Sequence, residues 1–102
     1  MNKVITDQLS EIKKLCTIYG VQSLYSFGSV TKNTFNKDSD IDLLIAFKKN
    51  LSIEDYTENY FTLHQKLSEL FKRKVDLVTE NSLINPYFIQ SVDQSKQLLY
   101  ES

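Results

Sequence analysis

The chain has 102 residues, of which 12 are basic and 13 acidic, and its formal net charge is -1. This length predicts one domain over residues 1–102. The near-neutral balance excludes the broad positive field that holds long nucleic acids, so we expect no direct nucleic-acid binding. Cys16 is the single cysteine, and the N-terminus turns polar after two apolar residues. These features predict a cytoplasmic protein without an internal disulfide or a membrane span.

Hydrophobic periodicity predicts helices and strands in the order helix, strand, strand, helix, strand, helix. Helical stretches place apolar residues every three or four positions, and the strands are short runs rich in β-formers. The order predicts an α+β fold, a small mixed sheet with helices packed mainly on one face. The expected elements are helices at Val4–Tyr19, Ile53–Phe71 and from Asn85-Pro86 through Val92 to Leu98-Leu99, and strands at Val21–Phe27, Ile41–Phe47 and Val75–Val78.

Three aspartates, Asp40, Asp42 and Asp76, lie in or beside the predicted strands. Because side chains alternate along a strand, Asp40 and Asp42 project to the same side. Carboxylates this close repel each other unless a cation compensates them, and Mg²⁺ prefers such oxygen ligands. Asp76 joins the pair if its strand lies beside the strand that carries Asp42. Three carboxylates can hold two ions, which stabilise the attacking and leaving oxygens of a phosphoryl transfer.

Gly28-Ser29 lies where the first predicted strand ends. A glycine at such a turn allows close backbone approach and leaves N–H groups that bind phosphate oxygens. The Ser29 hydroxyl adds a donor, and Lys32 adds a positive charge. We therefore expect Gly28, Ser29 and Lys32 to bind a nucleotide, and the three aspartates to bind metal and carry the catalysis.

Each part of this pattern also has a structural interpretation, since a Gly-Ser pair is a common turn and an Asp-x-Asp pair is often a solvated strand end. An EF-hand is excluded, because Leu43 and Lys49 stand where the calcium loop requires glycine and glutamate. We interpret the single histidine, His64, as structural or as a surface residue. Lys72-Arg73-Lys74 is interpreted as a solvated helix end or as a contact for an acidic partner. The tyrosines of the second long helix, Tyr56 and Tyr60, are interpreted as core or interface residues.

The string Phe27-Gly28-Ser29, followed after ten residues by Asp40-Ile41-Asp42-Leu43-Leu44, resembles the signature of the DNA polymerase β-like nucleotidyltransferases. The short chain resembles their minimal branch along nearly its whole length. The resemblance implies a fold like the polymerase β palm and two Mg²⁺ ions held by the aspartates. It further implies that Asp76 activates the attacking hydroxyl and that Gly28 and Ser29 contact the phosphates.

The resemblance also implies a partner, because minimal nucleotidyltransferases usually accompany a HEPN-domain toxin, an RNase. The antitoxin neutralises this toxin by transferring AMP from ATP to one of its tyrosines, in a homo- or hetero-oligomer. Many members read Gly-Ser-x-Ala-Arg-Gly where this chain reads Gly28-Ser29-Val30-Thr31-Lys32-Asn33. Lys32 keeps the charge of that arginine but loses its bidentate fork. A catalytically weak or inactive antitoxin that neutralises its partner by binding alone therefore stays open as the alternative.

Overall fold

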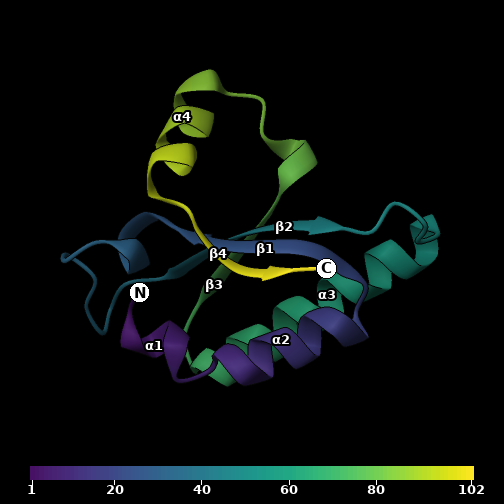
Figure 1. Ribbon diagram of the computed structural model, residues 1–102, viewed down its shortest axis with the longest axis horizontal. Coiled ribbons are helices and arrows are strands. Elements are labelled where there is room, and N and C mark those ends of the chain that lie inside the picture. The colour runs from purple at the N-terminus through teal and green to yellow at the C-terminus, as the bar shows by residue number, and fades with distance from the viewer.

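The computed structural model describes all of residues 1–102 as a four-stranded sheet covered by helices. Its elements are α1 (Lys3–Thr6), α2 (Leu9–Ile18), β1 (Val21–Phe27), the 3₁₀ helix η1 (Gly28–Thr31), β2 (Ile41–Phe47), α3 (Ile53–Phe71), β3 (Val75–Thr79), the 3₁₀ helix η2 (Glu80–Ser82), α4 (Pro86–Ser95) and β4 (Gln97–Glu101). The strand order is β3-β2-β1-β4. β1 runs antiparallel to both of its neighbours, and β2 and β3 are parallel. Figure 1 shows α1, α2 and α3 on one face of the sheet and α4 on the other, which confirms the predicted α+β arrangement.

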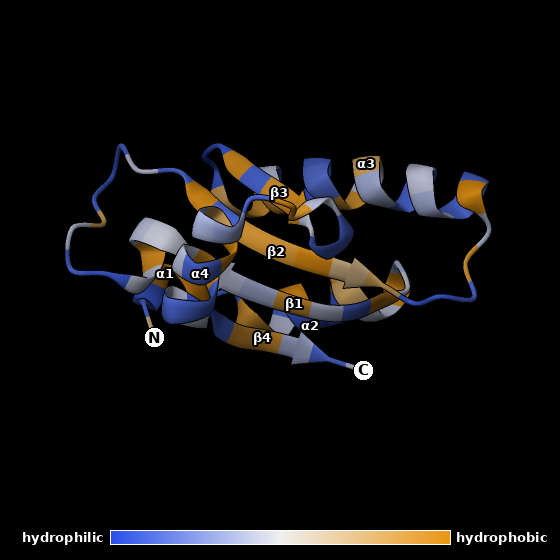
Figure 2. Cartoon of the chain, turned by 90° about the horizontal axis from the view of Figure 1, so that it is seen from above, coloured by the Kyte–Doolittle hydropathy of each residue, from blue (hydrophilic) through white to orange (hydrophobic).

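The main hydrophobic core lies between the sheet and the three helices on its lower face in Figure 1. β2 supplies its centre, because Ile41, Leu43 and Ile45 are completely buried. Figure 2 shows this strand as a nearly unbroken apolar run in the middle of the sheet. Cys16 is also completely buried, and burial raises the pKa of its thiol to about 12, so the thiol stays protonated. None of the helices combines the length and the apolar character that crossing a bilayer requires.

α3 provides the crossover that the parallel strands β2 and β3 require. The Ser52 side chain caps its first turn by accepting a hydrogen bond from the Asp55 N–H. Leu63, Leu67 and Phe71 are buried and attach the helix to the sheet. The helix ends at Lys72, whose φ of 55° turns the chain directly into β3. This crossover therefore determines where Asp76 lies relative to Asp42.

The structure corrects two sequence predictions. The helix predicted at Val4–Tyr19 is broken, because Asp7 has a low helix propensity and the chain leaves the helical conformation at Gln8, with φ -110° and ψ 5°. The predicted extension of the last helix to Leu98-Leu99 is wrong, since those residues belong to β4. Lys96 is extended, so it ends α4, and the free edge of β1 then offers backbone partners to the residues that follow.

α4 is attached to the upper face of the sheet by a small apolar cluster that is separate from the main core. A cluster of only three buried residues, Phe27, Leu44 and Val92, joins the helix to β1 and β2. The Phe88 ring packs edge-on against Phe27, with 6.0 Å between the ring centroids. Asn85 caps the start of α4 by accepting from the N–H groups of Tyr87 and Phe88, as the Asn-Pro pair predicts.

Gly28 occupies the turn between β1 and η1 with a φ of +71°, in the left-handed region that favours glycine. A Cβ atom at this position would lie 2.6 Å from Oδ2 of Asp42. The turn can therefore approach the Asp42 carboxylate closely only because position 28 has no side chain.

Gly28→Ala should lower the free energy of unfolding by about 2 kcal/mol, because it adds left-handed strain and displaces the Asp42 carboxylate. Gly20→Ala is the matched control, since Gly20 has a φ of +70° but its Cβ would meet only the flexible side-chain end of Leu51 at 3.2 Å. The control should lose about 1 kcal/mol. Urea denaturation measures the free energy of unfolding of both variants. Equal decreases would show that the closeness of Gly28 to Asp42 makes no contribution to the effect.

Candidate active site

The sheet register places the predicted carboxylates in one row across neighbouring strands. Phe27 of β1 pairs with Asp42 of β2, and Asp42 pairs with Asp76 of β3. Asp40 lies directly before β2, on the same side as Asp42 because strand side chains alternate. Gly28 follows Phe27 and lies so near the Asp42 carboxylate that a Cβ at position 28 would be 2.6 Å from its Oδ2. The fold thus brings together Gly28, Asp40, Asp42 and Asp76, as expected from the sequence.

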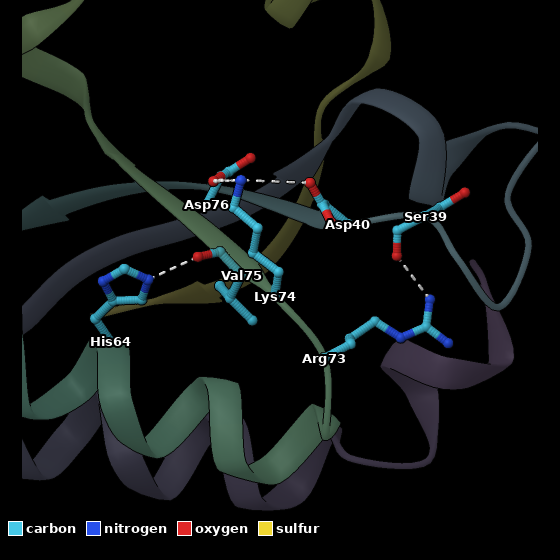
Figure 3. A network of polar contacts seen from close by, with 7 residues as sticks. All are labelled: Ser39, Asp40, His64, Arg73, Lys74, Val75 and Asp76. Carbon is cyan, nitrogen blue, oxygen red and sulfur yellow. Dashed lines mark hydrogen bonds and ion pairs between the residues drawn. The ribbon is translucent and has the colours of Figure 1, made fainter.

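The loop that carries Asp40 is held in place by Arg73, at the start of the segment that leads into β3. The Arg73 guanidinium donates to the backbone oxygens of Asn36 at 3.1 Å and Ser39 at 3.0 Å. It also lies 4.7 Å from the centroid of the Phe35 ring. Figure 3 shows the contact with Ser39, one residue before Asp40. Arg73 therefore positions this loop, whereas the sequence suggested a solvated helix end or a contact for an acidic partner.

Lys74 supplies the positive charge closest to the carboxylates. Its Nζ lies 3.7 Å from Oδ2 of Asp40 and 3.8 Å from Oδ1 of Asp76, so the ammonium bridges the two strands (Figure 3). Sequence reasoning missed this role by grouping Lys74 with the charged residues before it. The alternation of side chains along a strand could have predicted this contact, because Lys74 stands two positions before Asp76 and therefore shares its face of the sheet.

Asp42 lies in an environment that disfavours its charged form. Burial, a hydrogen bond with Asp76 and the charges of Asp76 and Asp40 raise its pKa from 3.8 to about 6, and Lys74 opposes this rise. No three acidic, histidine or cysteine side chains are arranged as a metal site here. The carboxylates instead contact one another and the ammonium. This arrangement concentrates negative charge that only a cation or a proton can compensate.

The predicted phosphate-binding residues take two different positions. The Gly28 N–H donates to Oγ of Ser95 at 3.1 Å, and the Thr31 hydroxyl donates to the Gly28 oxygen at 2.7 Å. Ser29 is half-buried at the second position of η1, beside Gly28. Lys32 is exposed and lines a separate recess near the N-terminus with Asn33, away from the carboxylates. Nucleotide binding by Ser29 and Lys32 stays a prediction, and Ser95 is a contact that the sequence did not reveal.

A cavity of about 420 Å³ opens beside the carboxylates. Asp42 and Asp76 form its polar wall, and aromatic and aliphatic side chains form the rest. His64, interpreted from the sequence as structural, reaches the Val75 backbone oxygen with Nε2 at 2.6 Å (Figure 3) and also faces this cavity. The residues that line it are Phe27, Asp42, Tyr60, His64, Asp76, Leu77, Val78 and Phe88. The site therefore combines clustered carboxylates with a ligand-sized, largely apolar space.

Comparison with known sequences identifies relatives that share most of the chain. MJ0126 of Methanocaldococcus jannaschii, described as a predicted protein adenylyltransferase, is 39% identical over 82 residues, which cover 80% of each chain. The protein adenylyltransferase MntA of Thermococcus cleftensis is 34% identical over 71 residues, which cover 70% of this chain and 68% of MntA.

Two solved structures share the fold over more than nine-tenths of the chain. A predicted minimal nucleotidyltransferase has a TM-score of 0.73 at 28% identity and matches 95% of each chain. A toxin–antitoxin structure with AMP-PNP has a TM-score of 0.69 at 27% identity and matches 92% of this chain and 73% of the other.

The fold, the row of carboxylates and the glycine turn agree with these similarities. The model of the Nucleotidyltransferase domain family matches residues 10–99, which include every residue of the row and of the turn. Because this model and the relatives match most of the chain, the chain belongs to the nucleotidyltransferase domain family.

Proposed function

We propose that this protein transfers AMP from ATP to a tyrosine hydroxyl of a HEPN-domain toxin and is the antitoxin of that toxin. The observation that carries the proposal is the pairing of Asp42 with Asp76 on adjacent strands, beside the glycine turn. The names of the relatives support a protein as the AMP acceptor, and the solved toxin–antitoxin structure with AMP-PNP supports ATP as the donor. The HEPN-type partner follows from the family resemblance of the sequence.

The positions of the residues suggest a division of roles. Asp76 lies at the β3 end of the row, where it can accept the proton of an incoming hydroxyl. Gly28 and Ser29 lie at the β1 end, where the turn approaches the carboxylates and can receive the leaving pyrophosphate. Asp42 lies between these two ends, where the reacting phosphorus would be held. This order matches the opposed directions of attack and departure in an in-line displacement.

The donor set of this site fits Mg²⁺. Asp40, Asp42 and Asp76 offer only carboxylate oxygens, and the position of the Lys74 ammonium between two of them supports a preference for positive charge there. The three aspartates would hold two ions. When bound, the ions would neutralise charge on the phosphates and on the attacking and leaving oxygens.

Replacement of Asp42 by asparagine should abolish AMP transfer. ATP labelled on its α-phosphate, Mg²⁺ and the adjacent HEPN-domain protein should give a labelled toxin with the wild-type antitoxin. Asp42→Asn should lower the labelling rate by on the order of a hundredfold or more, because it removes a carboxylate from the centre of the row.

Asp38→Asn is the matched control for that experiment, since Asp38 is exposed in the preceding loop and forms no ion pair. The control should label the toxin at the wild-type rate. Undiminished labelling by Asp42→Asn would refute the proposed chemistry. Neutralisation of the toxin by an Asp42→Asn antitoxin that no longer labels it would favour the alternative, an antitoxin that acts by binding alone.

Thermal unfolding without metal should show a pH dependence caused by Asp42. Its raised pKa means that the folded protein holds a proton more tightly than the unfolded chain, so this stabilisation is present below pH 3.8 and is lost as the pH rises through about 6. Asp42→Asn should therefore raise the Tm at pH 7.5 and change it little at pH 4. Mg²⁺ should raise the Tm of the wild-type protein at pH 7.5 but not that of the variant. A wild-type Tm that does not respond to Mg²⁺ would contradict the metal site.

A further inference from the structure

The residues that line the cavity beside the carboxylates come from both sides of Asp42 in the strand order. Phe27 and Phe88 form the end next to the Gly28 turn. Tyr60 and His64, which bind backbone oxygens of β3, line the other end, next to Asp76 and the free edge of β3. Val78 lies two positions after Asp76 on β3 and packs against the cluster of Phe27, Leu44 and Val92. Because an in-line displacement separates the leaving group from the attacking group, the two ends suit different parts of the reaction.

The β3 end is built by two side chains of α3 that hold the strand around Asp76. The Tyr60 hydroxyl donates to the Leu77 oxygen at 2.5 Å, and His64 Nε2 donates to the Val75 oxygen, which can only accept. Tyr60 and His64 stand one helical turn apart, so they bind the carbonyls on either side of Asp76. These contacts fix the backbone that carries Asp76. They also occupy backbone oxygens of β3 with which a strand of a partner protein would have to pair. This edge therefore favours the binding of a single side chain over the addition of a strand.

We propose that the β3 end of the cavity, lined by Tyr60 and His64, is the subsite for the acceptor side chain, a tyrosine ring of the partner protein. This inference rests on the proposed function. The acceptor oxygen would attack the α-phosphorus and pass its proton to Asp76. The new O–P bond would replace the bond to pyrophosphate, which would leave toward the Gly28 turn.

The surroundings of this subsite agree with an aromatic residue that a protein presents. The cavity of about 420 Å³ is within the range of ligand sites, roughly 300–1,000 Å³. The Phe61 ring lies edge-on to Tyr60 with 5.4 Å between centroids and is 65% exposed. Exposed aromatic surface beside a pocket is typical of a protein contact. Phe61 therefore extends the apolar wall outward, to where the body of a partner would lie.

Two variants test the subsite, because the KM for the acceptor protein and the Kd for the nucleotide can be measured separately. Val78→Trp adds bulk to the cavity from β3, and His64→Gln removes the imidazole ring but keeps a donor for the Val75 oxygen. Each should raise the KM for the HEPN-domain protein by on the order of tenfold. The Kd for AMP-PNP with Mg²⁺ should stay within about twofold of the wild-type value, because the proposed nucleotide contacts lie at the Gly28 turn.

Ala46→Trp is the matched control for bulk, because Ala46 lies on the same face of the sheet as Asp42 but does not line the cavity. It should leave both constants unchanged. An unchanged KM for the toxin in Val78→Trp and His64→Gln, with labelling intact, would overturn the subsite and leave the proposed function standing. A parallel loss of AMP-PNP affinity would also overturn it, because the β3 end would then hold the nucleoside. Failure of the wild-type protein to label any toxin would overturn both proposals.

Discussion

The parallel register between β2 and β3 is the constraint on which the site depends, because it pairs Asp42 directly with Asp76. A shift of one residue would turn Asp76 toward the core and bring Leu77 to the site, since neighbouring side chains point to opposite faces. The buried residues of α3 and the short turn at Lys72 maintain this register. The helix also reaches β3 with Tyr60 and His64, so the element that connects the strands holds the edge strand beside the carboxylates.

Repulsion between the carboxylates of the site lowers the stability of the folded protein, and other interactions must compensate for it. Asp42 is flanked by two other carboxylates, and Lys74 is the only cation paired with them. An ion pair this exposed contributes little to stability, on the order of 1 kcal/mol or less. The compensation comes mainly from the apolar core, where β2 is buried on both sides of Asp42. The residues that stabilise the sheet thus make it possible to place unfavourable charge at its surface, as in many active sites.

The sequence predicted the elements whose pattern is local. The helical period identified α3, the short apolar runs identified three strands, and their alternation placed Asp40 and Asp42 on one face. It did not predict β4, because Leu98-Leu99 continues the apolar spacing of α4 and only the free edge of β1 makes it a strand. The roles of Ser95 and Tyr60 depend on contacts between segments far apart in the sequence. Such contacts leave little trace in local periodicity.

The weak attachment of α4 gives the protein a unit that can open separately from the rest of the sheet. Three buried residues and the bond from the Gly28 N–H to Ser95 join this helix to the turn and the strands beneath it. Its amides should exchange with deuterium through local opening, well before those of β1 and β2. Thermodynamic linkage is reciprocal, so any ligand that orders the Gly28 turn also protects α4 from exchange. The helix would thus report on occupancy of the turn without itself contacting the reacting atoms.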